Sequence, residues 1–310
     1  MPRYVVTGGA GFIGSALVRL LLARGGEVRV VDNLLTGFEK NLDEVRPHIE
    51  FDHTDIRDYA ATAAAIRGAD IVFHLAAIPS VPRSIHDPVP SHEVNIGGTF
   101  NVLRACTEAK VQRVVYAASS SAYGDTLVLP KVESMLPQPK SPYAVQKLAS
   151  EYYASVFHSC FGLETISLRF FNVYGPRQDP SSPYSGVLSL FLKALVERQP
   201  PTIFGDGNQT RDFTYVEDVA VLCLKAATAP GVAGKMYNAG NGNRYSLNEV
   251  WELLQRIEGI RLPAQFGPPR EGDVRDSQAD TTAARRDLGH DPQFTLEEGL
   301  RRTLAWFRTQ

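Results

Sequence analysis

The sequence predicts an α/β fold in which a doubly wound parallel sheet is combined with a smaller C-terminal α/β lobe. A short β-rich run, Arg3–Thr7, leads directly into a glycine-rich turn and an apolar helical stretch at 15–23. Strands and helices then alternate at the spacing of right-handed parallel crossovers. After about residue 172 this alternation breaks. We therefore predict one domain over residues 1–172, to which the chain returns at about 212–245, and a lobe formed mainly by residues 173–310.

Composition limits the kinds of partner. Of the 310 residues, 44% are apolar and 21% are charged, and the formal net charge is −2. Because the chain has no excess of basic residues, we expect neither a nucleic acid nor a membrane surface as a partner. No apolar stretch is long enough to cross a bilayer. The N-terminus carries no export signal, and Cys106, Cys160 and Cys223 lack metal-ligand spacing. We expect a cytoplasmic protein with free thiols and no metal site.

The turn after the first strand reads Gly8-Gly9-Ala10-Gly11-Phe12-Ile13-Gly14. Glycines there allow the tight turn, let backbone N–H groups approach a diphosphate at the helix N-terminus, and pack the helix against the strand. The next strand ends in Asp32, where a carboxylate can bind ribose hydroxyls and would repel a 2′-phosphate. These features predict a Rossmann domain that binds NAD rather than NADP. The predicted cofactor residues of this region are Gly8, Gly11, Phe12, Ile13, Gly14 and Asp32.

Small or polar residues follow the later strands of the predicted sheet. Ligands of an open α/β sheet lie beyond the carboxyl ends of its strands, so these residues are expected to line the cofactor site. They are Asp55 after the third strand, Ala76 and Ala77 after the fourth, and Ser119, Ser120 and Ser121 after the fifth. The neighbouring Ile56 and Leu75 are also expected at the cofactor site.

Two features between the fourth and fifth strands leave alternatives open. The proline-rich segment 79–90 is expected to be a loop, which either forms a rigid surface connection or lies over the nicotinamide. Asn95, early in a helix expected at 93–109, either holds a strand carbonyl or a bound water at the cofactor site, or lies on the helix surface. Further helices are expected at about 59–66, 141–161, 186–197, 219–228, 246–257 and 296–309, and further strands at 113–118, 163–171, 212–216 and 235–240.

Tyr143 and Lys147 are four residues apart on a helix that Ser141-Pro142 is expected to start. A free tyrosine has a pKa near 10, but an adjacent ammonium and the positive nicotinamide ring would both favour the phenolate. Tyr143 could then take a proton from a substrate hydroxyl, while Lys147 donates to the nicotinamide ribose. Ser119, at the end of a strand, could hold or relay a proton to the same oxygen.

The chain resembles the extended short-chain dehydrogenases/reductases, the NAD-dependent epimerase/dehydratase family, and is most similar to bacterial UDP-N-acetylglucosamine and UDP-glucose 4-epimerases. The resembling motifs span nearly the whole chain. They are the glycine turn, Asp32-Asn33, Asp55, His74-Leu75-Ala76-Ala77, Asn95, Ser119 to Gly124, Ser141-Pro142-Tyr143 with Lys147, Arg169 to Gly175, Arg211-Asp212-Phe213 and Arg270 to Asp273.

This resemblance implies a reaction. Ser119, Tyr143 and Lys147 match the family's catalytic set, and Asn33 joins the cofactor residues. Tyr143 would deprotonate the sugar O4 as C4 is oxidised by NAD, and reduction of the rotated 4-keto sugar on its other face would give the epimer. Ser120 and Ser121 stand where the dehydratases have Asp and Glu, so elimination of water lacks its acid and base and 4-epimerisation is favoured.

The resemblance also implies the substrate residues. Asn172, Arg211 and Arg270 would contact the diphosphate, Asp273 the uridine ribose, and Ser120 and Ser121 the sugar. Ser277 aligns with the residue that closes the pocket near the sugar C2 group, and a small residue there leaves room for an acetamido group. A UDP-sugar is therefore the expected substrate, with UDP-GlcNAc/UDP-GalNAc favoured and UDP-glucose/UDP-galactose also accepted.

Other readings remain open from the sequence. Within enzymes they are a UDP-glucuronate 4-epimerase, a decarboxylase or a net oxidoreductase of the same scaffold. Outside enzymes, an NAD-sensing interaction protein could keep the fold and lose the chemistry. The family commonly pairs two long helices per subunit, so a homodimer through the helices near 93–109 and 141–161 is expected.

Overall fold

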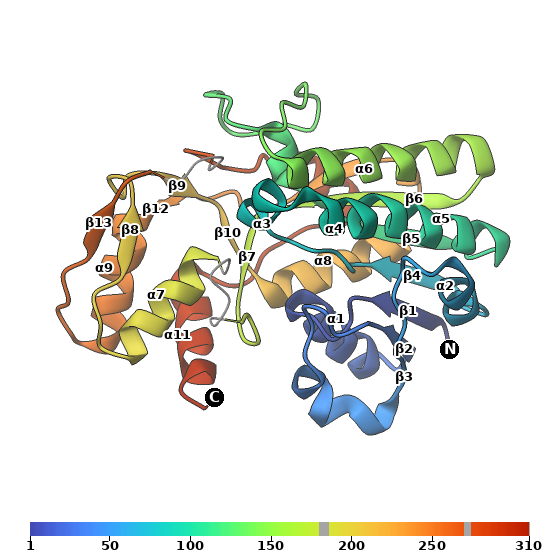
Figure 1. Ribbon diagram of the computed structural model, residues 1–310, viewed down its shortest axis with the longest axis horizontal. Coiled ribbons are helices and arrows are strands. Elements are labelled where there is room, and N and C mark those ends of the chain that lie inside the picture. The colour runs from blue at the N-terminus through green and yellow to red at the C-terminus, as the bar shows by residue number, and fades with distance from the viewer. Residues whose placement is uncertain (180–185, 270–273, 310) are drawn as a thin grey trace.

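The computed structural model describes residues 1–179, 186–269 and 274–309. Its centre is a parallel sheet of seven strands in the order β11-β6-β5-β4-β1-β2-β3 (Figure 1). This is the doubly wound order that the sequence predicts, since the chain moves outward from β1 in both directions. The strands are β1 (Arg3–Thr7), β2 (Glu27–Val31), β3 (Ile49–Asp52), β4 (Ile71–His74), β5 (Arg113–Ser119), β6 (Glu164–Phe170) and β11 (Met236–Ala239).

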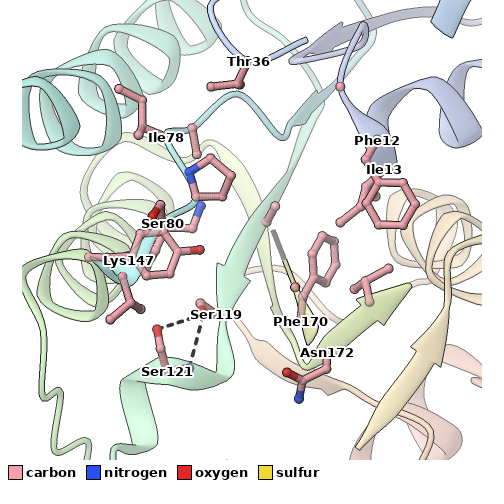
Figure 2. Close-up of a pocket in the computed structure, with 18 of the residues that line it drawn as sticks. Phe12, Ile13, Thr36, Ile78, Ser80, Ser119, Ser121, Lys147, Phe170 and Asn172 are labelled. Atoms are coloured by element: carbon pink, nitrogen blue, oxygen red, sulfur yellow. Dashed lines mark hydrogen bonds between the residues drawn. The ribbon is translucent and has the colours of Figure 1, made fainter. Parts of the chain in front are cut away.

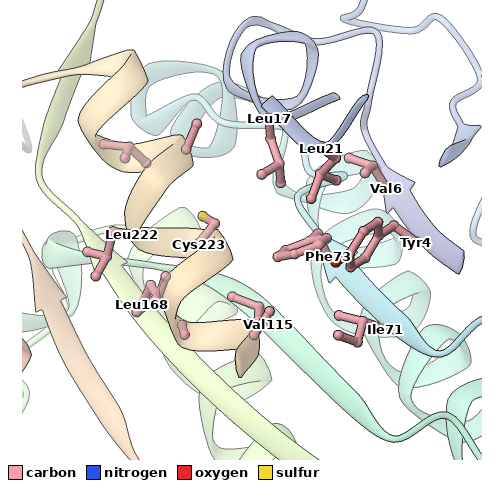
Figure 3. Close-up of a cluster of buried hydrophobic side chains, with 14 of the residues drawn as sticks. Tyr4, Val6, Leu17, Leu21, Ile71, Phe73, Val115, Leu168, Leu222 and Cys223 are labelled. Atoms are coloured by element: carbon pink, nitrogen blue, oxygen red, sulfur yellow. The ribbon is translucent and has the colours of Figure 1, made fainter. Parts of the chain in front are cut away.

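Helices cover both faces of this sheet, because successive strand residues point to opposite sides. Val6 of β1 packs towards α1 and α8, whereas Val5 packs towards α2, α5 and α6. Figure 3 shows the first of these layers, in which Leu17 and Leu21 of α1 face the sheet beside Leu222 and Cys223 of α8. The helices of the two faces are α1 (Phe12–Ala23), α8 (Val216–Thr228) and α10 (Thr282–Leu288) on one side, and α2 (Tyr59–Ile66), α5 (Thr99–Glu108) and α6 (Pro142–Phe161) on the other.

The C-terminal lobe, yellow to red at the left of Figure 1, has its own apolar core. Side chains of α7 (Val187–Val196), α9 (Leu247–Glu258) and α11 (Leu296–Phe307) pack together in it, with Phe191 edge-on to Trp251 at 5.4 Å. Short strand pairs complete the lobe and its junction with the sheet. They are β8 (Thr202–Phe204) with β13 (Gln265–Gly267), β9 (Thr210–Arg211) with β12 (Tyr245–Ser246), and β7 (Asn172–Tyr174) with β10 (Phe213–Tyr215).

The prediction of a loop at 79–90 was wrong. The segment forms two short helices, α3 (Val81–His86) and α4 (Pro88–His92). Ser80 accepts from Arg83 N at 3.1 Å and Asp87 from Val89 N at 3.3 Å, and each cap is followed by a proline in the first turn. Proline is well tolerated there because that N–H has no helical partner, so the residues taken as loop formers start the helices instead.

The helix expected at 93–109 begins as a π-helical turn, η2 (Glu93–Gly98), and continues as α5. Two 3₁₀ segments, η1 (Glu39–His48) and η3 (Ser120–Tyr123), follow β2 and β5. None of the helices in the described ranges has the length and apolar character to cross a bilayer. Across those same ranges, no group of three or more His, Cys, Asp or Glu side chains could hold a metal ion.

Candidate active site

A cavity of about 800 Å³ lies at the carboxyl ends of the sheet strands, where the lobe meets the sheet. Figure 2 shows Phe12 and Ile13 of α1 on one side, Lys147 of α6 on the other, and Ser119 and Ser121 at the end of β5. The cavity brings together most of the residues predicted from the sequence. Those that line it are Gly8, Gly11, Phe12, Ile13, Gly14, Asp32, Asn33, Asp55, Ile56, Leu75, Ala76, Ala77, Ser119, Ser120, Ser121, Tyr143, Lys147, Asn172, Arg211 and Ser277.

The glycine turn fits the diphosphate of a dinucleotide. Gly8 has φ +73°, and a Cβ on it would lie 2.7 Å from the Ala76 nitrogen. A Cβ on Gly14 would lie 2.1 Å from the Gly8 oxygen. Helix α1 begins at the N-cap Gly11 without a side-chain cap, so its first N–H groups are not taken by a side chain and point to where an anion is stabilised. The backbone here has the cradle that NAD requires.

The acidic residues beyond the turn are held in place by backbone N–H groups and by neighbouring side chains. Asp32 accepts from Ala10 N at 2.9 Å and Leu34 N at 2.8 Å, while its burial raises the pKa of the carboxyl. Asn33 donates to Asp55 at 2.9 Å, and a hydrogen bond from Arg57 lowers the pKa of Asp55 to about 2. Two carboxylates and an amide therefore face the adenosine end of the predicted cofactor site.

Asn95 is the one predicted residue of the described chain that does not line the cavity. It is 1% exposed, accepts from Ile78 N at 2.8 Å and donates to Ile78 O at 3.2 Å and to Gln146 at 2.9 Å. Of the two alternatives left open by the sequence, the surface position is wrong. Asn95 lies behind the site and ties the chain after β4 to α6.

Helix α6 carries Tyr143 and Lys147 into the cavity. Its N-cap is Ser141, which accepts from Ala144 N at 3.2 Å, and Pro142 occupies the first turn, as predicted. The Tyr143 N–H, which has no helical acceptor, donates to Ser84 of α3 at 3.1 Å. The segment that was expected to be a loop thus fixes the start of α6.

The prediction that Lys147 and the nicotinamide ring together favour the Tyr143 phenolate stays a prediction, because the groups of the chain alone shift this pKa the other way. Burial raises the pKa of Tyr143 to about 12, and a hydrogen bond with Ser119 opposes this only in part. Burial also lowers the pKa of Lys147 to about 7. Removal from water disfavours the charged form of both groups, and it outweighs their proximity on the helix.

Three serines occupy the end of β5 and the start of η3. The Ser119 and Ser121 hydroxyls are 2.8 Å apart, and Ser121 N donates to Ser119 Oγ at 3.2 Å. A Cβ on Gly124 would lie 1.9 Å from the Gln138 oxygen, so the turn after these serines requires glycine. The three serines line the cavity, as predicted, and Ser119 is hydrogen-bonded to Tyr143.

Three of the predicted substrate residues also line the cavity. Asn172 donates to Ser277 Oγ at 3.3 Å, and Ser277 is 8% exposed. Arg211 is anchored by hydrogen bonds to the Thr210 and Arg275 oxygens at 2.9 and 2.8 Å. Arg270 and Asp273, also predicted to bind the nucleotide, lie outside the described residues.

Several lining residues were not predicted. The segment after β2 adds Leu35, Thr36 and Phe38, and the lobe adds Leu190 of α7 and Phe204 of β8. The residues after β2 lie outside any periodic element, and Leu190 and Phe204 reach the cavity only through the packing of the lobe against the sheet. The same is true of Gln178 and of the buried Lys131.

Comparison with known proteins identifies this architecture. Residues 4–240 match the NAD dependent epimerase/dehydratase family. A UDP-glucose 4-epimerase of Mycolicibacterium smegmatis is 39% identical over 99% of both chains. The crystal structure of a Thermotoga maritima UDP-glucose 4-epimerase with UDP-glucose has a TM-score of 0.95 at 37% identity, covering 99% of both chains. A UDP-N-acetylglucosamine 4-epimerase of Methanobrevibacter ruminantium, in complex with UDP-N-acetylmuramic acid, has a TM-score of 0.95 at 34% identity, covering 99% and 98%. The chain therefore belongs to the NAD dependent epimerase/dehydratase family.

Proposed function

We propose that this nucleotide-sugar 4-epimerase, which uses NAD, interconverts UDP-GlcNAc with UDP-GalNAc and also accepts UDP-glucose and UDP-galactose. Its relatives at 34–39% identity include epimerases of both plain and acetylated sugars, so the family supports the reaction and leaves the sugar open. The choice between plain and acetylated sugars depends on the side chains that surround the sugar in the cavity.

We assign roles to three residues. Tyr143 takes the proton from the sugar O4 and returns it to O4 after the 4-keto sugar has rotated, Ser119 hydrogen-bonds the same oxygen, and Lys147 binds the nicotinamide ribose. Bound NAD would supply the acceptor and donor for the C4 hydride, and its positive ring would favour the Tyr143 phenolate. Because burial raises the pKa of Tyr143 to about 12, the phenol alone is a poor base at neutral pH. The roles of Asn172, Arg211, Arg270 and Asp273 in holding the UDP group remain predictions.

Ser277 is the observation that carries the sugar assignment. Its side chain lines the cavity but turns its hydroxyl towards Asn172 at 3.3 Å and Asp212 N at 3.5 Å. A hydroxymethyl group directed into the wall leaves space for a substituent on C2, whereas a large ring at this position would fill it. The space next to Ser277 therefore supports an acetamido sugar.

UDP-glucuronate is the alternative substrate, and one observation favours it. Lys131 lines the same cavity and is 1% exposed, and burial lowers the pKa of its ammonium. A cation at the sugar end could pair with a C6 carboxylate. Lys131 also donates to the Thr126 oxygen and interacts with Asp125 and Asp276, so its charge is partly neutralised.

The reaction is tested by supplying the purified enzyme with a panel of UDP-sugars without added cofactor and identifying products by NMR and mass spectrometry. We expect C4 epimers of the acetylated pair at a rate equal to or above that of the glucose pair. Turnover of UDP-glucuronate alone would establish the alternative substrate. No turnover of any UDP-N-acetylhexosamine would remove the acetamido assignment.

The role of Ser277 is tested with Ser277→Tyr, using Ser277→Ala as the control that keeps the space open. The tyrosine variant is expected to lose activity on UDP-GlcNAc and keep activity on UDP-galactose, while the alanine variant keeps both. An equal loss of activity on both sugars in Ser277→Tyr would show that residue 277 does not select for the size of the C2 substituent.

We also propose that the enzyme is a homodimer formed through α5 and α6. Val145, Tyr152 and Val156 lie on one face of α6 and are 49%, 54% and 47% exposed. Phe100 of α5, 39% exposed, stacks edge-on against Tyr153 beside them. A contiguous apolar face on two adjacent helices is suited to pairing with a second copy. The cytoplasmic location expected from the sequence stays a prediction.

A further inference from the structure

Lys147 carries its ammonium into a site without a carboxylate partner. The side chain is 4% exposed, and within residues 1–179, 186–269 and 274–309 no carboxylate lies within 4.0 Å of its Nζ. The nearest acid on the same face of α6 is Glu151, one turn further along the helix. Arg169 of β6 binds both Glu151 oxygens, at 2.9 and 2.7 Å, and so removes it as a partner for the lysine.

An aromatic ring lies where the carboxylate would be expected. Tyr116 of β5 is 1% exposed, and its ring centroid is 4.7 Å from Lys147 Nζ. Its hydroxyl donates to the Lys147 carbonyl oxygen at 3.4 Å, and burial holds the pKa of this phenol well above its usual value. Tyr116 therefore stays neutral, with its ring turned towards the ammonium and its hydroxyl fixed to the same helix.

His74 of β4 is paired with Tyr116 in the sheet and lies beside its ring. The two ring centroids are 5.6 Å apart, and the imidazole nitrogens of His74 are bound to Thr7 at 2.7 Å and Thr99 at 2.9 Å. Burial, with the charge of Lys147 as a second cause, lowers the pKa of His74 to about 3. The histidine is therefore neutral, and no second cation competes for the ring.

We propose that Tyr116 is a positioning residue of the epimerase, whose ring face holds the charged form of Lys147 next to Tyr143. The proposal rests on the catalytic role assigned to Lys147 above. A carboxylate would bind the ammonium through its N–H donors and would cancel the local charge. A ring face attracts the cation through its quadrupole and leaves the N–H donors free for a ribose hydroxyl and the positive charge close to the phenol.

The contact can be observed without substrate. The enzyme is labelled with ¹³C at the lysine ε carbon, and the Lys147 signal is assigned as the one missing from Lys147→Met. In the wild type the ε protons should be shifted upfield by the ring current of Tyr116. Tyr116→Phe keeps the ring and should keep the shift, whereas Tyr116→Met fills most of the volume without a ring and should lose it.

Titration of the same signal tests the effect on charge. Loss of the ring should lower the pKa of Lys147 by about one unit in Tyr116→Met and leave it within a few tenths in Tyr116→Phe. The groups that face this ammonium are Tyr143 on α6, Tyr116 on β5 and His74 on β4, and the Glu151–Arg169 pair lies one turn away. Of these, only Tyr116 differs among the three proteins.

Kinetics supply the functional readout. In Tyr116→Met the alkaline limb of the kcat profile should move down by about one pH unit, because Lys147 loses its proton earlier. The KM for the UDP-sugar should be unchanged, since Tyr116 does not line the cavity. Tyr116→Phe should match the wild type in both. A Phe variant that behaves like the Met variant would assign the effect to the hydroxyl and overturn the proposal.

The NMR spectra test the contact between Lys147 and Tyr116 independently of the epimerase reaction. Absence of an upfield shift in the wild type overturns the proposal even if Tyr116→Met does not fold, and even if the enzyme epimerises every sugar tested. Conversely, an upfield shift that depends on the ring supports the contact even if the proposed substrates prove wrong.

Discussion

Burial controls the charge of the two groups on α6 that face the cavity. Tyr143 and Lys147 are both removed from water, so the pKa of the phenol rises to about 12 and that of the ammonium falls to about 7. Burial therefore disfavours the charged form of each group. Under the roles proposed above, the ring face of Tyr116 would stabilise the charged form of Lys147, and the oxidised cofactor would stabilise that of Tyr143.

Replacing Tyr143 by phenylalanine removes the proposed base and keeps the ring. We expect kcat for epimerisation to fall by about 10²–10⁴-fold, the range contributed by a positioned proton-transfer group. NAD binding, followed by fluorescence, should change little, because the glycine turn and Asp32 are untouched. Retention of wild-type kcat would exclude Tyr143 as the base.

Lys147→Met is expected to be more stable than the wild type in protein freed of NAD. The folded-state pKa of Lys147, about 7, is below the unfolded value of 10.5, so the stability linked to this group is complete above pH 10.5 and is lost as the pH falls to 7. The difference in the free energy of unfolding between Lys147→Met and the wild type should therefore increase as the pH falls from 10.5 to 7, by on the order of 2–4 kcal/mol.

The measurement is urea unfolding at several pH values. Lys140→Met is the control, because its side chain is 53% exposed and its removal should produce no such trend. A stability difference between Lys147→Met and wild type that stays constant with pH would mean that the ammonium is not destabilised by burial.

At the scale of elements, the positions of the site residues depend on two junctions, where separate segments of the chain meet. One is the glycine turn, where β1 and α1 approach so closely that side chains are excluded. The other is Asp212, fully buried before β10, which accepts from Asn241 N, Gly242 N and Ala279 N at 2.8, 2.9 and 3.0 Å. It joins the end of β11 and the segment after Ser277 to the strand that follows Arg211.

Gly14→Ala should damage the first junction. The new Cβ would lie 2.1 Å from the Gly8 oxygen, a backbone atom, so α1 must shift from β1 at a cost of about 2 kcal/mol or more. NAD affinity should fall with it. Gly97→Ala is the matched control, since a Cβ there meets nothing within 4 Å and should change stability by less than about 1 kcal/mol. Thermal unfolding and NAD titration measure both effects.

Asp212→Asn should loosen the second junction. An amide has one acceptor oxygen where the carboxylate has two, so buried N–H groups lose their partner at a cost of about 1–3 kcal/mol. We expect a higher KM for the UDP-sugar with a smaller change in kcat. Asp218→Asn is the control, because Asp218 also accepts two backbone N–H groups, from Gln293 and Phe294, but lies away from the cavity.

If Asp218→Asn raises KM as much as Asp212→Asn, the effect reflects general destabilisation of the lobe and not the position of Arg211 and Ser277. Chemical unfolding of both variants establishes that their stability losses are comparable before KM is compared.

At the scale of the whole molecule, the sheet and the lobe each supply one side of the cavity. On one side of the sheet, α5 and α6 expose several large apolar side chains, which are Phe100, Val145, Tyr152, Tyr153 and Val156. On the other side, the described residues of α1 and α8 expose no comparable apolar surface. Figure 1 shows α5 and α6 running side by side along one face, away from the lobe. Pairing through this face would leave the cavity accessible.

Val156→Glu should convert the proposed dimer into a monomer, because a charge on the apolar face of α6 would be buried without a partner. Light scattering coupled to size exclusion should show half the wild-type mass. Val221→Glu is the matched control, since Val221 is 37% exposed on α8 and covers the opposite face of the sheet. A wild type that already elutes as a monomer would remove the dimer proposal.

The sequence by itself determined the sheet, the glycine turn and the start of α6, because each depends on local signals: strand and helix periods, glycine where a Cβ clashes, and the Ser141-Pro142 cap. It also placed most of the described site residues in one cavity, since strand ends of a parallel sheet meet at one edge. It failed at 79–90, where a proline-rich, polar segment predicts a loop although the N-caps Ser80 and Asp87 and a proline in each first turn start two helices.

Only the tertiary structure decided the electrostatics and the outer wall of the site. The pKa of Tyr143 depends on burial by elements far apart in the sequence, and the partner of Lys147 is a ring on β5, 31 residues before it. Likewise, Leu190 and Phe204 reach the cavity only because the lobe folds back over the sheet. Burial and contact across distant segments have no local sequence pattern, and this is the physical reason that they could not be read from the chain alone.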